Sequence, residues 1–410
     1  MSSRHRLRRN KHYYSKMRVL HLATSSEGGA GIAAKRIVEA QIENGLEAHL
    51  ISRDNQNQVS PRRLSLMIGK LVTVLTKIVT VRRYGFVSPY SISTININEV
   101  KSFNPDIVNI HNWYNFLSIS DLLKISKKYP VVFTFHDSRL ATGGCHVTLG
   151  CNLFETECKQ CPAIKLSFLA HLSKLHSDEV FSKLGPYAVV SPSSWLLSEL
   201  SNSIAVKESK YSHVIHNPIN INNYPKREHF SQDVIKAVFV SASLDSEFKG
   251  LKMLMKALHE YSNSFPDSRL EVDLVGNTNQ NYDQTISKVK ITTRGVLDQA
   301  SLEAVMVSSD LLLVPSQSDN FPNVISEAQL FGTLVVGTKV GGIPEMIEDG
   351  VTGVLSENNP SDFAYAINKA IEVNNKTTIL NTARIRATER SNQIQIVKQY
   401  SEVYEKMLQK

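Results

Sequence analysis

Residues 310–332 read DLLLVPSQSDNFPNVISEAQLFG. The apolar run Leu311–Val314 predicts a buried β-strand that ends at Pro315, because a short continuous apolar run before a turn signal is typical of a strand covered on both faces. A polar loop follows, and a helix is expected to begin near Pro322 or Asn323. A strand, a loop and a helix in this order form the repeating unit of α/β domains with parallel sheets.

The same unit recurs along the whole chain. The predicted strands are Arg18–Leu22, Glu47–Ile51, Ile107–Ile110, Val131–Phe135, Ala188–Ser191 and His213–His216 in the first half, and Ala237–Ala242, Glu271–Val275, Val289–Thr292, Leu311–Val314 and Thr333–Gly337 in the second. Between the two series lies NPININNYPKR (217–227), with two prolines, four asparagines and no apolar periodicity, which predicts a linker.

We therefore predict an α/β chain of two facing Rossmann-like, doubly wound domains with a ligand cleft between them. The expected boundaries are residues 17–218 and 219–384, and residues 385–410 are expected to return to the first domain. Within that last segment, Gln393–Leu408 has a helical pattern of apolar residues.

Length and composition agree with two globular domains. The chain has 410 residues, of which 42% are hydrophobic and 20% charged, and this excludes disordered, collagen-like and coiled-coil proteins. Its net charge of +8 is concentrated: residues 1–16 and 55–98 each carry six Lys or Arg and no acid, so the remainder is near −4. Local basic patches argue against a surface that coats nucleic acid, and no nucleic-acid partner is expected.

Two basic segments bear on location. No apolar stretch of a signal peptide follows the N-terminus, so a cytoplasmic protein is expected. Segment 64–81 (LSLMIGKLVTVLTKIVTV) is flanked by arginine pairs and has lysines inside it, which makes a transmembrane helix improbable. It is either an interfacial helix on the anionic inner face of the plasma membrane or a core helix of the first domain. Residues 1–16 are either a disordered basic arm that binds that membrane, or they do not belong to the protein because translation starts at Met17.

Two loops are expected to receive a ligand. In the first, SSEGGAGIAAKRI places Gly28, Gly29 and Gly31 between a strand and a helix, where they either admit a phosphate or simply make a tight turn. In the second, Asp319 and Glu327 are eight residues apart, and a carboxylate at Glu327 suits the two ribose hydroxyls of a nucleotide. Backbone N–H groups at the start of this helix would face a phosphate or sugar, and the residues expected to contact the ligand there are Asn320, Phe321, Pro322 and Asn323.

The second loop also resembles a known family. The pattern PS-x-S-D-x-F-P-N-x-x-x-E-A-x-x-x-G, followed by GGIPE (341–345) and DGVTG (349–353), looks like the donor site of retaining glycosyltransferases of family 4. The resemblance covers residues 17–410 and is strongest to the branch that builds colanic-acid-type exopolysaccharide and lipopolysaccharide. It implies the GT-B fold, a UDP- or GDP-sugar donor, a lipid-linked or oligosaccharide acceptor, and hexosyl transfer without a catalytic metal.

The resemblance also implies roles for single residues. Glu327 matches the second glutamate of the E-x7-E motif, which binds the donor ribose, and Asp319 replaces the first, which contacts the transferred sugar. Lys249 matches the lysine that neutralises the donor diphosphate. The arginine of that motif would fall at Leu244 and is missing, and Arg294 is a candidate to replace it.

Four further residues follow by the same resemblance. His136, at the end of the strand in VVFTFHD, would contact the donor sugar near the reaction centre, although a lone histidine after a strand is often structural. Gly295 and Val296, before a helix expected at 299–308, align with a loop that touches the nucleobase. Gly342, in the Gly341–Gly342 pair, would let the donor approach a helix start, or would only make a turn.

A cluster of cysteines remains. Cys145, Cys151, Cys158 and Cys161 are the only cysteines of the chain, spaced C-x5-C-x6-C-x2-C. Four thiols in such a short segment suit one structural zinc ion. An iron–sulfur cluster, two labile disulfides and plain buried cysteines are the alternatives.

Two other functions compete with glycosyl transfer. A zinc-containing nucleic-acid-binding protein would need basic residues around the cysteines, but Lys159 is the only one between 145 and 161. A GT-B enzyme of another reaction, such as a nucleotide-sugar epimerase, would act on a soluble substrate and would not need the apolar segment 64–81.

Overall fold

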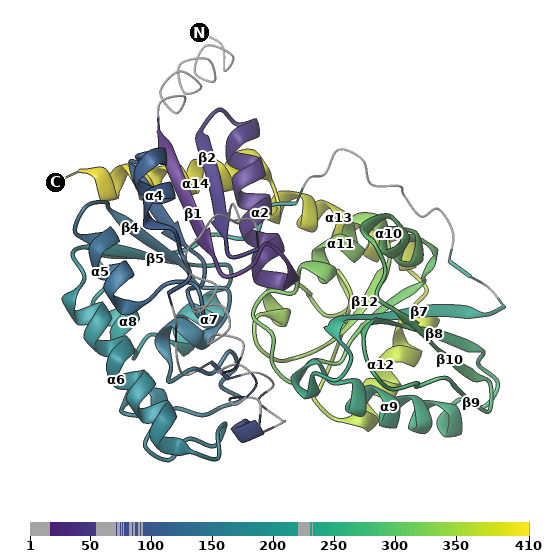
Figure 1. The fold of residues 1–410 in the computed structure, drawn as a ribbon. Helices are drawn as coiled ribbons and strands as arrows, with labels where there is room; N and C mark the ends of the chain where they lie inside the picture. The colour runs from purple at the N-terminus through teal and green to yellow at the C-terminus, as the bar shows by residue number, and fades with distance from the viewer. Residues whose placement is uncertain are drawn as a thin grey trace, which may run out of the picture. The chain divides into compact units, whose positions relative to one another are not determined.

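The computed structural model describes residues 17–54, 93–219 and 233–409, with residues 230 and 231 and scattered positions between 71 and 91. The chain divides into two compact units: unit 1 comprises Met1–Asn220 and Asn392–Lys410, and unit 2 comprises Ile221–Ser391 (Figure 1). The tail 1–16, the basic residues in and around segment 64–81, and most of the predicted linker 217–227 lie outside the described residues.

Unit 1 is built on six parallel strands in the order β2-β1-β3-β4-β5-β6. Its strands are β1 (Arg18–Ala23), β2 (Glu47–Ser52), β3 (Ile107–Ile110), β4 (Val131–Thr134), β5 (Tyr187–Ser191) and β6 (Tyr211–Val214). Its helices are α2 (Gly28–Glu43), α4 (Ile97–Phe103), α5 (Ile119–Ser126), α6 (Ser167–Lys183), α7 (Ser194–Glu199), α8 (Ile204–Lys207) and α14 (Gln393–Leu408).

The last helix of the chain belongs to unit 1. Helix α14 packs on α2 and β5, so the yellow C-terminal helix lies beside the purple N-terminal one in Figure 1. Its buried face includes Tyr400 and Tyr404, which share a core cluster with Val19 of β1 and Ile37 of α2. The apolar spacing of α14 places these side chains on one face, and their burial fixes the helix to the sheet.

Unit 2 contains a seven-stranded sheet in the order β13-β12-β11-β7-β8-β10-β9. Its strands are β7 (Ile235–Ser243), β8 (Leu270–Asn277), β9 (Gln284–Ile286), β10 (Val289–Gly295), β11 (Leu311–Val314), β12 (Leu334–Thr338) and β13 (Val354–Ser356). Its helices are α9 (Leu251–Ser264), α10 (Gln299–Ser308), α11 (Asn323–Phe331), α12 (Pro360–Glu372) and α13 (Lys376–Arg390). The strand β9 at one edge is antiparallel to β10, and the other pairs are parallel.

Both faces of this sheet are covered. Leu311 and Leu313 of β11 belong to one core cluster, whereas Leu312 and Val314 belong to another. Alternate residues of a strand point to opposite faces, so two clusters along one four-residue strand mean that the strand is buried on both sides. This is why several strands, β11 (LLLV) among them, read as nearly continuous apolar runs.

The α/β fold predicted from sequence is confirmed. Every predicted strand overlaps an observed one, and helix α10 has the predicted bounds. The sequence did not predict β9 and β13, which have three residues each and lie at the two edges of the sheet. An edge strand of three residues carries too few side chains to show a period of two.

Candidate active site

Three loops of unit 2 meet at the carboxyl ends of adjacent strands. The loop after β7 carries Lys249, the loop after β11 carries Asp319, and the loop after β12 carries Gly341 and Gly342. The chain runs from β7 outward through β8 to β10 and then returns to the other side of β7 with β11, so the strand order reverses between β7 and β11. Open parallel sheets bind ligands at such a reversal, outside the carboxyl ends of the strands.

The first two loops are held together by their backbones. The Gln317 N–H donates to the Phe248 carbonyl at 2.7 Å. Gly250, with a φ of +83°, lies so close that a Cβ atom there would be 1.8 Å from the Pro315 carbonyl oxygen. Only glycine permits both this backbone conformation and this approach, which explains why a glycine follows Lys249.

Lys249 and Asp319 form an ion pair. The Lys249 Nζ atom is 2.7 Å from Asp319 Oδ2, and the two side chains are 29% and 12% exposed. Ser316 donates a further hydrogen bond to the same oxygen at 3.3 Å. The sequence assigned the lysine and the carboxylate separate roles, and the structure places them in one contact, open to solvent on the lysine side.

The third loop fixes the backbone of Asp319. The Gly342 N–H donates to the Asp319 carbonyl oxygen at 2.9 Å. A Cβ atom on Gly341, whose φ is +61°, would be 1.9 Å from the same oxygen. The glycine pair is therefore needed for a close backbone contact that orients Asp319, whether or not a donor also lies against it.

Helix α11 begins directly beyond this carboxylate. Its first residue, Asn323, follows Pro322, whose ring cannot cap the helix, and no acidic side chain lies in the first turn. The positive end of the helix dipole, about half a charge, is thus not offset by an acid of that turn. Phe321 is buried, Asn320 is half-buried, and Glu327 is half-buried in the middle of α11.

A residue that the sequence did not single out supports this helix. Arg390 at the end of α13 donates to Gln329 Oε1 at 2.6 Å and to Ser326 Oγ at 3.1 Å. Its guanidinium also lies 6.0 Å from the ring centroid of Phe321. Burial lowers the pKa of Arg390 to about 10, which leaves it charged at neutral pH.

The loop that the sequence predicts to touch the nucleobase lies farther along the sheet. Gly295 ends β10, which β8 separates from β7, and Val296 is 73% exposed. The Arg294 Nε atom is 2.9 Å from Asp273 Oδ1, and both side chains line a pocket with Lys236 at the start of β7. Arg294 is thus engaged by Asp273 in a pocket whose lining does not include Lys249, and the structure does not pair the two cations at one site.

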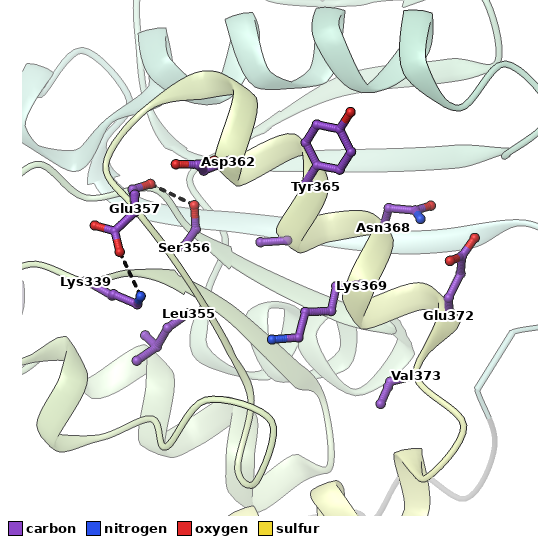
Figure 2. Close-up of a pocket in the computed structure, with 11 residues that line it drawn as sticks. Lys339, Leu355, Ser356, Glu357, Asp362, Tyr365, Asn368, Lys369, Glu372 and Val373 are labelled. Atoms are coloured by element: carbon purple, nitrogen blue, oxygen red, sulfur yellow. Dashed lines mark hydrogen bonds and ion pairs between the residues drawn. The ribbon is translucent and has the colours of Figure 1, made fainter.

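Unit 2 also has a groove between α12 and the ends of β12 and β13, shown in Figure 2. Lys339 at its rim is paired with Glu357 at 2.7 Å, and Lys369 with Asp349 at 3.0 Å. Its lining holds three carboxylates and two ammonium groups, which makes it unsuitable for a diphosphate.

In unit 1, His136 follows β4 and is half-buried. It is part of a chain of three histidines, because its Nε2 lies 2.8 Å from His111 Nδ1 and the His111 Nε2 lies 2.9 Å from His21 Nδ1. The sequence did not predict His21 and His111 as site residues. A histidine inside the apolar strand RVLHLA was the available signal, because a polar side chain buried in a strand needs a partner.

The glycine-rich loop of unit 1 makes a tight turn. A Cβ atom on Gly31 would be 2.6 Å from the Ser25 carbonyl oxygen, whereas one on Gly29 would meet nothing within 4 Å. Asp54, after β2, accepts hydrogen bonds from Ser25 and Ser26. Burial acts to raise the pKa of Asp54, but these bonds and one from Ser52 outweigh it and lower the pKa to about 2. Gly31 is thus explained by the turn, and Gly29 remains available to a ligand.

The four cysteines lie in one neighbourhood as free thiols. The Cys145 thiol donates to Cys161, which lowers the pKa of Cys161 with help from two backbone N–H groups, and raises the pKa of Cys145. Backbone N–H groups also donate to Cys151 and Cys158. Thiols with such donors suit zinc chemically. Within the described residues, however, no three His, Cys, Asp or Glu side chains are arranged to hold a metal ion. The structural zinc ion stays a prediction.

Comparisons with known proteins agree with this architecture. The sequence pattern of Glycosyltransferase Family 4 matches residues 27–223, and that of Glycosyl transferases group 1 matches residues 235–372. The chain is a glycosyltransferase of the GT-B type. A 41.2 kDa protein in the cps region of Klebsiella pneumoniae is 21% identical over 378 residues, which cover 88% of this glycosyltransferase and 90% of the relative.

Two further similarities are informative. The D-inositol 3-phosphate glycosyltransferase of Corynebacterium diphtheriae is 32% identical over 137 residues, which cover 31% of this chain and 32% of that protein. The structure of Anabaena Alr3699/HepE in complex with UDP-glucose superposes with a TM-score of 0.59 at 18% identity, and the match covers 95% of this glycosyltransferase and 100% of that chain. At this identity, the second similarity shows the fold alone.

Proposed function

We propose that this glycosyltransferase transfers a sugar with retention of configuration from a UDP- or GDP-sugar to a lipid-linked or oligosaccharide acceptor in surface polysaccharide synthesis. The observation that carries the donor class is the Lys249–Asp319 pair at the strand-order reversal, next to the start of α11. A diphosphate needs a cation and backbone donors, and a sugar needs a fixed carboxylate. UDP-glucose in the complex of Anabaena HepE supports the same class of donor.

The residues of unit 2 divide the work of donor binding. Lys249 exchanges Asp319 for the diphosphate and offsets the charge that develops on the leaving group, with the dipole of α11 behind it. Asp319, held by Ser316 and Gly342, then accepts from hydroxyls of the transferred sugar. Glu327 accepts from the two ribose hydroxyls, and Gly295 and Val296 receive the nucleobase.

The transfer itself takes place on one face of the sugar. The bond between the anomeric carbon and the donor phosphate oxygen breaks as the acceptor oxygen attacks from the same side. The acceptor proton passes to the departing phosphate oxygen, so that charge and protons balance. His136 orients a sugar hydroxyl during this step.

The acceptor class is supported by exposed apolar side chains on unit 1. Leu71, Val74 and Ile78 are 59%, 55% and 66% exposed, whereas Thr76 between them is buried. An antiparallel bridge between Thr80 and Ile164 joins this segment to the start of α6, where Phe168 is 57% exposed. Apolar side chains that face solvent on two adjoining segments fit the boundary of a bilayer.

Membrane binding of this kind would be peripheral. No helix within the described part of the chain combines the length and the hydropathy needed to cross a bilayer. The relative from the cps region of Klebsiella pneumoniae supports the assignment to surface polysaccharide synthesis. We place the enzyme at the inner face of the plasma membrane, where a lipid-linked acceptor would lie.

A panel of nucleotide sugars in a thermal-shift assay tests the donor. We expect one UDP- or GDP-sugar to raise the unfolding temperature more than its bare nucleotide does, and no response to the entire panel would contradict the proposal.

Flotation with anionic vesicles tests the membrane surface. Phe168→Glu should weaken binding, whereas Tyr365→Glu, at a 61% exposed position of α12 in unit 2, should not. Equal binding of both variants and the unsubstituted protein would exclude this surface.

A further inference from the structure

Helix α11, which begins at the proposed donor site, is held by an arginine from another helix. Helices α11 and α13 pack side by side in unit 2 (Figure 1). Arg390, the last residue of α13, donates to Ser326 Oγ at 3.1 Å and to Gln329 Oε1 at 2.6 Å, both from its Nη2. Its Nη1 donates to the Met346 carbonyl oxygen at 3.4 Å. Ser326 and Gln329 are each 1% exposed, so these bonds are made inside unit 2.

The guanidinium of Arg390 has no carboxylate partner. The three acceptors that it contacts are neutral, and it forms no ion pair within the described part of the chain. Its Nε atom is buried and has no hydrogen-bond partner among the described residues. Burial lowers the pKa of Arg390 to about 10, so the side chain is still charged at neutral pH. An unpaired buried charge is costly, and a neutral amide would serve neutral acceptors without this cost.

The loops proposed to bind the donor are short of positive charge. The segments that follow β7, β11 and β12, up to Gly250, Pro322 and Gly342, contain two lysines and three carboxylates, so their net charge is −1: Lys249, Lys339, Asp245, Glu247 and Asp319. Both lysines are paired with carboxylates, at 2.7 Å in each case. The diphosphate of a nucleotide sugar brings further negative charge. Its binding therefore needs positive charge from outside these loops.

Arg390 is close enough to supply that charge. Its guanidinium lies 6.0 Å from the ring centroid of Phe321, which precedes α11 by one residue. Ser326 is the fourth residue of α11, so its bond to Arg390 is about 4.5 Å along the axis from the helix start. An anion on the first N–H groups of α11 would thus be about 10 Å from the guanidinium. Because the guanidinium is partly buried, salt screens this attraction less than it would for a surface charge.

We propose that Arg390 is a positioning residue of the donor site, whose unpaired charge beside the start of α11 adds to the helix dipole and favours a diphosphate over an uncharged ligand. The inference rests on the proposed function, because both take the start of α11 as the place of the diphosphate. Arg390 acts at a distance, through the helix that it holds, whereas Lys249 contacts the diphosphate itself.

Two substitutions separate the charge of Arg390 from its hydrogen bonds. Arg390→Gln removes the charge and keeps a polar side chain, whereas Arg390→Lys keeps the charge with fewer hydrogen bonds. Arg390→Met, an apolar chain of similar length, repeats the first measurement if Arg390→Gln does not fold. Isothermal titration calorimetry of the full-length protein gives the Kd for UDP, GDP and inorganic pyrophosphate, and for uridine and guanosine as uncharged counterparts.

The expected changes depend on the charge of the ligand. Two unit charges about 10 Å apart change an affinity about tenfold at the effective dielectric constant of about 20 near a protein surface. We therefore expect Arg390→Gln to raise the Kd of the diphosphates about tenfold and to leave the Kd of the nucleosides unchanged, with Arg390→Lys close to the unsubstituted protein. Equal losses for diphosphates and nucleosides, or equal losses in Arg390→Gln and Arg390→Lys, would mean that Arg390 only supports the fold and would overturn the inference.

Arg384 offers the matched control. It lies on the same helix, and its Nε donates to the Leu330 carbonyl oxygen at 3.1 Å, near the other end of α11. This bond is about 6 Å farther along the axis from the helix start than that of Arg390. Arg384→Gln removes the same charge from the same pair of helices and should change the diphosphate Kd much less. Equal effects of Arg384→Gln and Arg390→Gln would overturn the specific role of Arg390.

The ligands also separate this inference from the proposed function. Binding of UDP or GDP with the same Kd in Arg390→Gln as in the unsubstituted protein would overturn the role of Arg390 and leave the proposed function standing. Pyrophosphate binding that depends on Arg390, in a protein that binds neither UDP nor GDP, would contradict the proposed function alone. No binding of any of the three charged ligands would overturn both.

Discussion

The contact between Gly341 and Asp319 gives the sharpest test of how the proposed donor loops are built. In Gly341→Ala, the new Cβ atom would lie 1.9 Å from the Asp319 carbonyl oxygen, at a φ of +61°. The left-handed conformation costs about 1–2 kcal/mol for a residue with a side chain, and the overlap adds about 1–3 kcal/mol. Gly341→Ala should therefore be destabilised by about 2–5 kcal/mol in total, because Asp319 or the glycine loop has to move to make room for the Cβ atom.

Gly350→Ala is the matched control. Gly350 has a φ of +75°, but nothing lies within 4 Å of its Cβ position. It should therefore lose only the conformational term of about 1–2 kcal/mol. For a domain of this size, about 2–4 °C is lost per kcal/mol, so calorimetry should show a drop of about 2–8 °C for Gly350→Ala and about 4–20 °C for Gly341→Ala.

Donor binding supplies the second readout. Gly341→Ala displaces Asp319 and should reduce the thermal shift caused by the nucleotide sugar, whereas Gly350→Ala should keep it. Equal losses of unfolding temperature in the two variants, with the donor response intact in both, would refute the inferred contact.

Three further outcomes are expected. Lys249→Ala should lower turnover by about 10- to 100-fold, because a charge-assisted hydrogen bond is worth about 1.5–3 kcal/mol. Lys252→Ala, which removes an exposed partner of Glu247, should leave turnover unchanged. Equal turnover in the two variants would show that Lys249 is not part of the site. Unit 1 should lose stability as the pH falls from 6.5 toward 4, because His21 binds a proton in the unfolded chain but not in the folded one, where its pKa is about 4. Denaturant titrations should show a loss of about 2 kcal/mol in the free energy of unfolding by pH 5. Equal stability at pH 7 and pH 5 would contradict this expectation. Elemental analysis of protein purified without chelator should find about one zinc ion for the four thiols, as expected for a tetrahedral site, and a ratio near zero would exclude that ion.

The fold could be predicted because its signals are local. Buried strands such as β4 (VVFT) and β11 (LLLV) appear as short apolar runs, and helix α14 appears through the spacing of its apolar residues. The residues of the proposed donor loop are also close in the sequence, since Asp319 and Glu327 lie within one strand–loop–helix unit. The pairing of strands that are distant in the sequence leaves no such local signal, so the order of the strands in each sheet could not be derived from the apolar runs.

The amino-acid sequence by itself determined the alternation of strands and helices, the division into two halves, and which side chains were available for donor chemistry. Only the tertiary structure decided that Lys249 and Asp319, 70 residues apart, form one ion pair, and that the rings of His21 and His111, 90 residues apart, lie within hydrogen-bond distance. The physical reason is that long-range strand pairing brings the carboxyl ends of parallel strands to one edge of a sheet. Residues that are remote along the chain become hydrogen-bond partners there, and glycines such as Gly250 and Gly341 are needed because these loops touch through their backbones.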